Sequence, residues 1–244
     1  ISDNLLEEIS AWIALQTGLH FPRKNWHMLK KAAQTAAAAY KMDTLEFLEQ
    51  ILPPSPDSRL HDALVTRLTI GESYFFRDKH LFQVLKDQIL RELISQLVGD
   101  NQPVNIFSAG CASGEEPYSI AILIDQAFPM VRERPITIIG TDINPLFLEK
   151  AENGIYSRWS LRETPDSIIN QYFTPMKNGY FKLLTRIRKK VRFRRLNLME
   201  QKYPSGLGFR ESFHIILCRN VLMYFKEHVR TQVLEKLTRL LAIN

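Results

Sequence analysis

The stretch Ile106-Phe-Ser-Ala-Gly-Cys-Ala-Ser-Gly-Glu-Glu-Pro-Tyr-Ser119 decides the fold of this 244-residue chain. Its apolar start predicts a buried strand over residues 104–108, and residues 115–128 have the apolar spacing of a helix. A strand that enters a helix through a glycine turn is typical of an open parallel α/β sheet. Gly110 and Gly114 allow the backbone to approach a ligand at the carboxyl end of the strand.

This turn differs from the loop that binds dinucleotides. It reads G-x-x-x-G rather than G-x-G-x-x-G, and Glu115 and Glu116 stand where a pyrophosphate needs unopposed backbone amides. The turn therefore disfavours a phosphate and favours a cationic ligand. A structural role is the alternative, because Ser113 and Glu116 also have the spacing of a capping box.

Helices and short apolar runs alternate around the turn. The further expected elements are helices over 81–97, 145–153 and 227–241 and strands over 136–140 and 215–218. This alternation predicts an α/β fold with a parallel sheet and crossover helices. We assign the strands expected over 180–184 and 191–196 to a small inserted β-subdomain of residues 154–195.

The first 70 residues predict a separate helical domain, followed by a second domain over 71–244. Helices are expected over 4–17, 22–40, 44–52 and 57–68. Asn4 and Glu7 have the spacing of a capping box at the first helix, and Gly18 can end that helix.

The net charge of +6 is unevenly distributed. Residues 71–153 carry a net charge of −5, whereas residues 154–195 hold 11 basic and 2 acidic residues. A smaller basic run lies in and just after the predicted second helix: Arg23, Lys24, Lys30, Lys31 and Lys41. Such basic stretches favour an acidic macromolecular partner, either protein or nucleic acid, with a solvated surface as the alternative.

The composition excludes several classes of protein. With 45% hydrophobic and 24% charged residues, the chain is neither disordered nor of low complexity. We expect a soluble, intracellular protein with no membrane insertion, since no apolar run could span a bilayer and no signal peptide is visible. Cys111 and Cys218 lack the spacing of a zinc site, so we expect no metal.

An acidic residue ends the strand predicted after the glycine turn. Asp142 closes the stretch Ile138-Ile-Gly-Thr-Asp142, where a carboxylate can accept hydrogen bonds from both ribose hydroxyls. Asn144 and Pro145 suit the N-cap and first turn of the next helix, so Asp142 is not needed for capping.

Two more stretches carry polar groups. Cys218-Arg-Asn-Val-Leu-Met-Tyr-Phe225 places Arg219, Asn220 and Tyr224 after the strand predicted over 215–218. Leu68-Thr-Ile-Gly-Glu-Ser-Tyr-Phe-Phe-Arg-Asp78 joins the two predicted domains, and its Arg77 can reach a carboxylate.

Together these four stretches resemble the CheR-type methyltransferases of bacterial chemotaxis. T-x-x-E-S-Y-F-F-R-D, G-C-A-S-G-E-E-P-Y-S, G-T-D-I-N and C-R-N-V-L-M-Y-F occur in the order of that family, and the likeness runs from about residue 5 to the last predicted helix. The resemblance implies a Rossmann-like S-adenosylmethionine-dependent methyltransferase sheet with an N-terminal helical domain and a small β-subdomain. It also implies a cytoplasmic enzyme that methylates glutamate side chains on the cytoplasmic helices of a chemoreceptor and releases S-adenosylhomocysteine.

The resemblance assigns site residues position by position. The cofactor contacts, including the glycine turn, would be Ser73, Arg77, Gly110, Glu116, Asp142 (ribose), Asn197 and Leu198 (adenine), and Arg219 and Asn220 (methionine end). Arg77 and Tyr224 would face the reacting centre, and the basic insertion and basic second helix would face the receptor.

The chemistry agrees with these residues. A sulfonium cofactor is cationic, which suits Glu116 and the acidic balance of residues 71–153. A glutamate carboxylate, with an ordinary pKa of about 4.3, is already ionised at pH 7 and needs no general base. Arg77 can orient it, and Tyr224 is the candidate for contact with the transition state, with aromatic packing as its alternative.

Two other functions stay open at this point: a nucleic-acid methyltransferase and a noncatalytic S-adenosylmethionine-binding interaction module. The chain has R-N-V-L-M-Y where an N-P-P-Y motif would stand, and its basic residues lack interleaved aromatics, so we expect no nucleic acid partner. We expect a monomer. Because the chain begins without Met and stops before the family's last strands, we expect an excised or incompletely represented protein.

Overall fold

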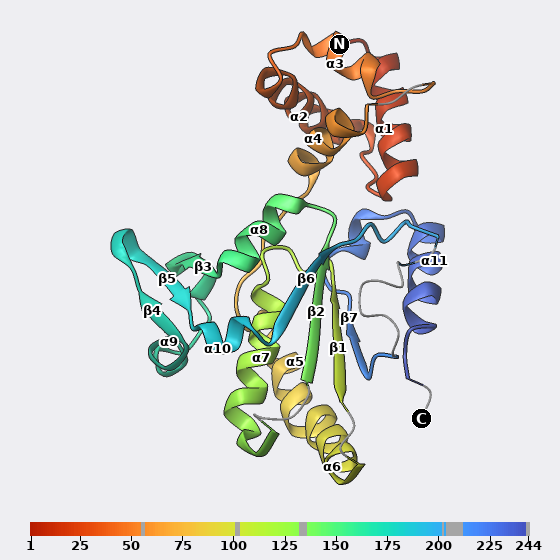
Figure 1. The fold of residues 1–244 in the computed structure, drawn as a ribbon. Helices are drawn as coiled ribbons and strands as arrows, with labels where there is room; N and C mark the ends of the chain where they lie inside the picture. Colours follow the sequence, from red (N-terminus) through yellow and green to blue (C-terminus); the bar gives the residue numbers. More distant parts are fainter. Residues whose placement is uncertain (55–56, 101–102, 132–135, 202, 204–211, 243–244) are drawn as a thin grey trace. The chain divides into compact units, whose positions relative to one another are not determined.

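The computed structural model describes residues 1–54, 57–100, 103–131, 136–201, 203 and 212–242. They divide into two compact units, whose elements are shown in Figure 1. The helical unit comprises Ile1–Ile70, Asn197–Gln201 and Asn220–Lys236, and the sheet unit comprises Gly71–Leu196, Lys202–Arg219 and Leu237–Asn244.

The sheet unit is built on four parallel strands. They are β1 (Val104–Ala109), β2 (Ile136–Asp142), β6 (Val191–Arg195) and β7 (Ile215–Leu217), in the order β6-β2-β1-β7. Ser108 of β1 lies opposite Gly140 of β2 and Leu217 of β7, so the carboxyl ends of these strands meet at one edge. The α/β fold with a parallel sheet is therefore confirmed.

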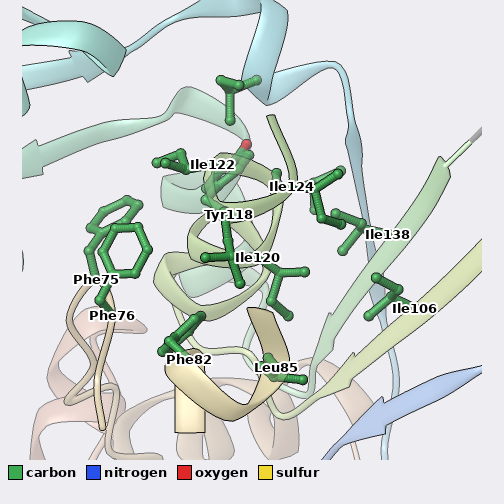
Figure 2. Packing of buried hydrophobic residues seen from close by; sticks show 14 of the residues in the cluster. Phe75, Phe76, Phe82, Leu85, Ile106, Tyr118, Ile120, Ile122, Ile124 and Ile138 are labelled. Atoms are coloured by element: carbon green, nitrogen blue, oxygen red, sulfur yellow. The ribbon is translucent and has the colours of Figure 1, made fainter. Parts of the chain in front are cut away.

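The helices of this unit surround a single apolar core. They are α5 (Lys79–Val84), the π-helical η2 (Leu85–Leu90), α6 (Arg91–Asp100), α7 (Glu115–Ala127), η3 (Pro129–Val131) and α8 (Pro145–Asn153). Helix α7 is buried from Pro117 to Asp125, because apolar side chains cover it on more than one face. Figure 2 shows its Tyr118, Ile120 and neighbours between Phe75 on one side and Ile106 on the other.

The inserted segment forms its own small sheet. Its elements are β3 (Ile155–Ser157), η4 (Arg158–Leu161), α9 (Asp166–Tyr172), β4 (Phe173–Pro175), η5 (Lys177–Gly179), β5 (Tyr180–Leu183) and α10 (Thr185–Arg188). Strands β3, β5 and β4 pair antiparallel in that order.

One strand assignment from the sequence was wrong. Residues 191–195 belong to the main sheet, paired with β2, and not to the insertion. Val191 and Phe193 are buried, whereas Arg192 and Arg194 are exposed, as suits a strand at the edge of a sheet with one covered face. A strand of the inserted sheet would show the same alternation of buried and exposed residues. The sequence pattern alone therefore could not assign residues 191–195 to one sheet or the other.

The helical unit contains α1 (Asp3–Thr17), η1 (Arg23–Asn25), α2 (Trp26–Ala39), α3 (Thr44–Gln50), α4 (Ser58–Leu68), η7 (Leu222–Tyr224) and most of α11 (Glu227–Thr238). Helix α1 ends at left-handed Gly18 as expected, but the capping box at Asn4 was wrong, because Ser2 accepts the hydrogen bond from the Leu5 N–H. Small buried side chains on α2, such as Ala33 and Ala36, let neighbouring helices approach closely.

Gly114 is required by packing as well as by its backbone angle. Its φ is +86°, and an added Cβ would lie 2.8 Å from the Ala151 Cβ and 2.9 Å from the Phe193 ring. Gly179 has a similar φ of +73° but has no atom within 4 Å of an added Cβ. Both glycines have a left-handed backbone, but only Gly114 is crowded. Substitutions at the two positions therefore distinguish the cost of backbone strain from the cost of overpacking.

We therefore predict that Gly114→Ala lowers the free energy of unfolding by about 2–4 kcal/mol, from left-handed strain plus overpacking. The matched variant Gly179→Ala should lose only about 1 kcal/mol, from the strain alone. Urea denaturation measures both. Equal losses would contradict the tight packing at Gly114.

Candidate functional site

The turn after β1 folds back onto the end of β2. The N–H groups of Gly110 and Cys111 both donate to the Thr141 carbonyl at 2.8 Å, and the Ala112 N–H donates to Asp142 Oδ2 at 2.9 Å. Gly110, Ala112 and Gly114 all have positive φ. Three successive amides of the turn are thus used inside the protein.

Asp142 lies half-buried at the end of β2. Its Oδ1 accepts a hydrogen bond from the Asn144 N–H at 2.9 Å, while Oδ2 accepts the bond from Ala112. Burial raises the pKa of the carboxyl, and the backbone donors partly oppose that rise. Each carboxylate oxygen can accept a second hydrogen bond. Asn144 caps α8 through Leu146 N and Pro145 occupies the first turn, as predicted.

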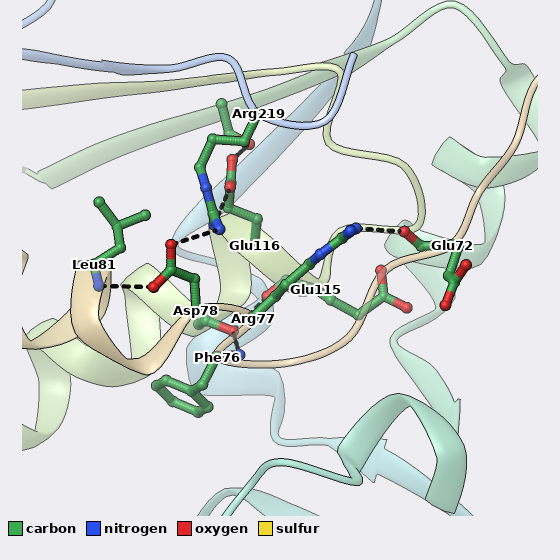
Figure 3. A network of polar contacts seen from close by, with 10 residues as sticks. Glu72, Phe76, Arg77, Asp78, Leu81, Glu115, Glu116 and Arg219 are labelled. Atoms are coloured by element: carbon green, nitrogen blue, oxygen red, sulfur yellow. Dashed lines mark hydrogen bonds and ion pairs between the residues drawn. The ribbon is translucent and has the colours of Figure 1, made fainter. Parts of the chain in front are cut away.

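Glu116 and Arg219 form an ion pair beside this turn (Figure 3). Arg219 Nη1 lies 3.1 Å from Glu116 Oε2, and the Ser108 hydroxyl donates to Oε1 at 2.7 Å. Burial raises the pKa of Glu116, and Ser108, Arg219 and Arg77 oppose this rise. The charge of Arg77 therefore acts on Glu116. The structure therefore brings the predicted site residues Glu116, Arg219 and Arg77 together in the sheet unit.

Glu115 has a different environment from its neighbour. It is 1% exposed, and the Ser113 hydroxyl donates to it at 3.0 Å and the Ser160 hydroxyl at 3.4 Å. Burial raises its pKa. The proposed capping box of Ser113 with Glu116 is wrong, because Gly114 is the N-cap of α7 and Ser113 bonds to Glu115. Glu115 ties the first turn of α7 to η4.

The loop of residues 72–78 holds Ser73 and Arg77 in the sheet unit. Arg77 Nη1 donates to the Glu72 carbonyl at 3.0 Å, and Asp78 Oδ2 lies 3.5 Å from Arg219 Nη2 (Figure 3). Phe76 and Asp78, on either side of Arg77, both have positive φ. An irregular backbone of this kind persists only where its surroundings hold it.

Buried contacts hold this loop. The Phe75 N–H donates to the Ser160 carbonyl and the Phe76 N–H to the Ser119 hydroxyl, both at 2.9 Å. The Phe75 ring packs edge-on against Tyr156 at 4.8 Å. Neither Ser119 nor Ser160 was predicted from the sequence to support the loop. Ser119 is the last letter of the glycine-turn motif, but no local pattern indicates its partner 43 residues away.

The other four predicted site residues lie in the helical unit. Asn197 Nδ2 donates to the Gln16 carbonyl at 2.7 Å, and its Oδ1 accepts from the Met199 N–H. Leu198 is buried. Asn220 is exposed with a φ of +58°, and Tyr224 is half-buried in η7.

Part of the basic stretch has a structural use. Arg186 pairs with buried Asp125 at 3.2 Å and lies over the Tyr172 ring. Arg188 Nη1 donates to the Glu152 carbonyl at 3.3 Å, at the end of α8. Other exposed basic side chains of the stretch of residues 154–195 include Lys177, Lys182, Lys189, Arg192, Arg194 and Arg195.

Among the residues that the structure describes, no three His, Cys, Asp or Glu side chains lie close enough together to hold a metal ion. None of the described helices has the length and apolar character needed to cross a membrane.

Comparisons with known proteins agree with the motifs. Residues 71–244 match the family model "CheR methyltransferase, SAM binding domain". The chain is 35% identical over 173 residues to chemotaxis protein methyltransferase 2 of Vibrio cholerae and 33% over 175 residues to the chemotaxis protein methyltransferase of Borreliella burgdorferi. Each match covers 71% of this chain, but only 58% and 60% of those relatives.

A third relative matches over a longer region. The chemotaxis protein methyltransferase of Vibrio parahaemolyticus is 29% identical over 241 residues, which cover 97% of this chain and 84% of the relative. The family model covers more than two thirds of the chain, and two of these relatives are more than 30% identical to it. The chain therefore belongs to the CheR methyltransferase family, and its residues 71–244 correspond to the family's S-adenosylmethionine-binding domain.

Proposed function

We propose that this protein transfers a methyl group from S-adenosylmethionine to glutamate side-chain carboxylates of a chemoreceptor or chemoreceptor-like protein, giving glutamyl methyl esters. One observation carries the proposal within this family. Carboxylates, and not free amides, border the turn at the carboxyl edge of the sheet, because Gly110, Cys111 and Ala112 already donate to Thr141 and Asp142. Those three amides are unavailable to a pyrophosphate, whereas a cationic sulfonium cofactor would find Glu116 and Asp142.

The residues present fit S-adenosylmethionine. Each Asp142 oxygen accepts a backbone hydrogen bond, from Ala112 or Asn144, and an ionised carboxylate has about four acceptor sites, so Asp142 would also hold the ribose hydroxyls. Glu116 and Arg219 offer opposite charges to the ammonium and carboxylate of the methionine end. The other proposed contacts are Ser73, Arg77, Gly110, Asn197, Leu198 (the latter two at the adenine) and Asn220.

When bound, the cofactor supplies the electrophilic methyl group. The glutamate of the substrate is ionised at neutral pH, so the chain needs no general base. What the protein must provide is alignment of the carboxylate, where effective molarity supplies about 7–11 kcal/mol. Arg77 would orient that carboxylate, and Tyr224 would contact the reacting centre.

The partner and the organisation are also part of the proposal. An acidic receptor bundle suits two sets of exposed basic residues: Lys182, Lys189, Arg192, Arg194 and Arg195 of the basic stretch 154–195, and Lys24 of η1 with Lys30 and Lys31 of α2. We propose a cytoplasmic, monomeric enzyme with no nucleic acid partner. We propose a helical domain over 1–70 and a methyltransferase domain over 71–244, whose insertion ends before β6 and so covers residues 154–190.

We predict that Asp142→Ala weakens binding of S-adenosylhomocysteine by about tenfold to a hundredfold, since charge-assisted hydrogen bonds are lost. Asp142→Asn, which keeps one carbonyl acceptor, should lose less. Isothermal titration calorimetry measures both, and exposed Glu149→Ala serves as the control for loss of a carboxylate. A folded Asp142→Ala protein with wild-type affinity would refute the ribose assignment.

Substitutions at the proposed reacting centre should affect turnover more than folding. We expect Arg77→Ala and Tyr224→Phe to keep near wild-type melting temperatures and to lose most methyl transfer to receptor fragments, because both side chains are only half-buried. Exposed Tyr40→Phe is the matched control. Unchanged kcat in Tyr224→Phe would assign that residue to packing.

Salt should slow the reaction at low receptor concentration, because long-range attraction is screened over about 8 Å at physiological ionic strength. Reversing exposed Lys189 and Arg192 to Glu should remove much of this salt dependence and leave kcat at saturation intact. Arg188 is unsuitable, since it caps α8. Reversal of exposed Arg230 and Arg239 gives the same change in charge outside the stretch. An equal effect of both pairs would contradict a localised receptor surface.

If purified protein methylated RNA and left receptor fragments unmodified, the nucleic-acid alternative would replace this proposal. Radiolabelled methyl transfer from S-adenosylmethionine to each substrate, followed by alkaline release of methanol from glutamyl esters, distinguishes the two reactions. Binding of the cofactor without transfer to either substrate would indicate an interaction module.

A further inference from the structure

Arg162 is held between two aromatic rings. Its guanidinium carbon lies 3.8 Å from the centroid of the Tyr74 ring and 4.2 Å from that of the Trp159 ring. Its Nη1 donates to the Trp159 carbonyl at 2.8 Å, and its Nη2 lies 3.7 Å from Glu72 Oε1. The side chain is only 21% exposed, although it is charged and belongs to the insertion.

Both loop residues that Arg162 contacts also contact Arg77. The Glu72 carbonyl accepts a hydrogen bond from Arg77 Nη1 at 3.0 Å (Figure 3), and the Arg77 guanidinium lies 5.6 Å from the centroid of the Tyr74 ring. Two guanidinium groups therefore share one ring. A chain of direct contacts leads from Arg162 through Glu72 and Tyr74 to Arg77.

The start of the loop depends on side chains for its position. Backbone hydrogen bonds tie the loop to Ser160 and Ser119 at Phe75 and Phe76. Glu72 and Tyr74 precede these bonds, and Arg162 contacts both of them. A planar guanidinium can stack on two rings while it donates hydrogen bonds in its own plane, which an ammonium group cannot do.

We propose that Arg162 is a positioning residue for methyl transfer: stacked between Trp159 and Tyr74, it fixes Glu72 and Tyr74 and, through them, the Arg77 guanidinium. This inference rests on the proposed function, in which Arg77 orients the substrate carboxylate. It gives a role in that reaction to a residue that lies 85 positions from Arg77 in the sequence.

The test compares two identical substitutions on neighbouring arginines. Arg162→Lys keeps the charge but loses the planar stack, so kcat with a receptor fragment should fall by about tenfold to a hundredfold, the cost of a misplaced catalytic group. The KM for S-adenosylmethionine should change little. Arg158→Lys is the matched control: Arg158 is the first residue of η4, which ends just before Arg162, and it forms an exposed ion pair with Asp166 at 2.9 Å, so kcat should stay unchanged.

Variants of Tyr74 test the role of the ring. Tyr74→Phe keeps the ring and should keep kcat, whereas Tyr74→Leu should lower kcat to a similar extent as Arg162→Lys. Unchanged kcat in both Arg162→Lys and Tyr74→Leu would overturn the proposal. Loss of kcat in Arg158→Lys equal to that in Arg162→Lys would also overturn it, because a general effect on the insertion would then explain the result.

A readout independent of turnover separates this inference from the proposed function. In ¹⁵N-labelled protein, the Nε resonance of Arg77, assigned with Arg77→Lys, should shift or broaden in Arg162→Lys and stay unchanged in Arg158→Lys. An unchanged resonance in Arg162→Lys would overturn the positioning role even if the wild type is active. Absence of methyl transfer by the wild type would refute the proposed function, and the resonance would still decide whether Arg162 positions Arg77.

Discussion

The Thr141 carbonyl organises the carboxyl edge of the sheet. By accepting hydrogen bonds from the N–H groups of both Gly110 and Cys111, it draws the turn after β1 over the end of β2. That geometry places the Ala112 N–H on Asp142 and orients the first turn of α7, so Glu116 reaches Ser108 and Arg219. The amides of Gly110, Cys111 and Ala112 are thereby unavailable to an anion. The charged acceptors at this edge include the carboxylates of Glu116 and Asp142.

Two adjacent glutamates at the start of α7 have separate tasks because neighbouring residues on a helix point in different directions. Glu116 turns toward the end of β1 and pairs with Arg219. Glu115 turns into the core, where the hydroxyls of Ser113 and Ser160 donate to its carboxylate. The insertion is thereby linked to the same helix turn that forms the candidate site.

The parallel sheet and the positions of Glu116, Asp142 and Arg219 were predictable from sequence because each depends on local patterns: an apolar strand, a glycine turn, and a polar residue where a strand ends. Parallel strands then bring these residues to one edge without further information. Two predictions were wrong: the N-cap of α1 at Asn4 and the assignment of residues 191–195 to the insertion. Ser2 competed with Asn4 as a cap, and a half-exposed strand looks the same in either sheet.

The supports of the Arg77 loop could not be predicted in this way. Ser119, Ser160 and Arg162 lie 43 to 90 residues from their loop partners, and their residue types are ordinary in helices and turns. Only the fold shows that they converge. The roles of Ser73, Asn197, Leu198, Asn220 and Tyr224 stay predictions, which rest on resemblance to the family.

The insertion has two parts, which differ in how well they can tolerate changes of sequence and length. Its inner part contributes Tyr156 and Tyr172, both fully buried, to the core of the sheet unit. Its outer hairpin is exposed from Thr174 to Tyr180, and the Met176 N–H closes it by donating to the Tyr180 carbonyl. Length and sequence at this tip can therefore diverge between related chains without cost to the core. A fluorescent label or an affinity tag placed there would leave the sheet and its site intact.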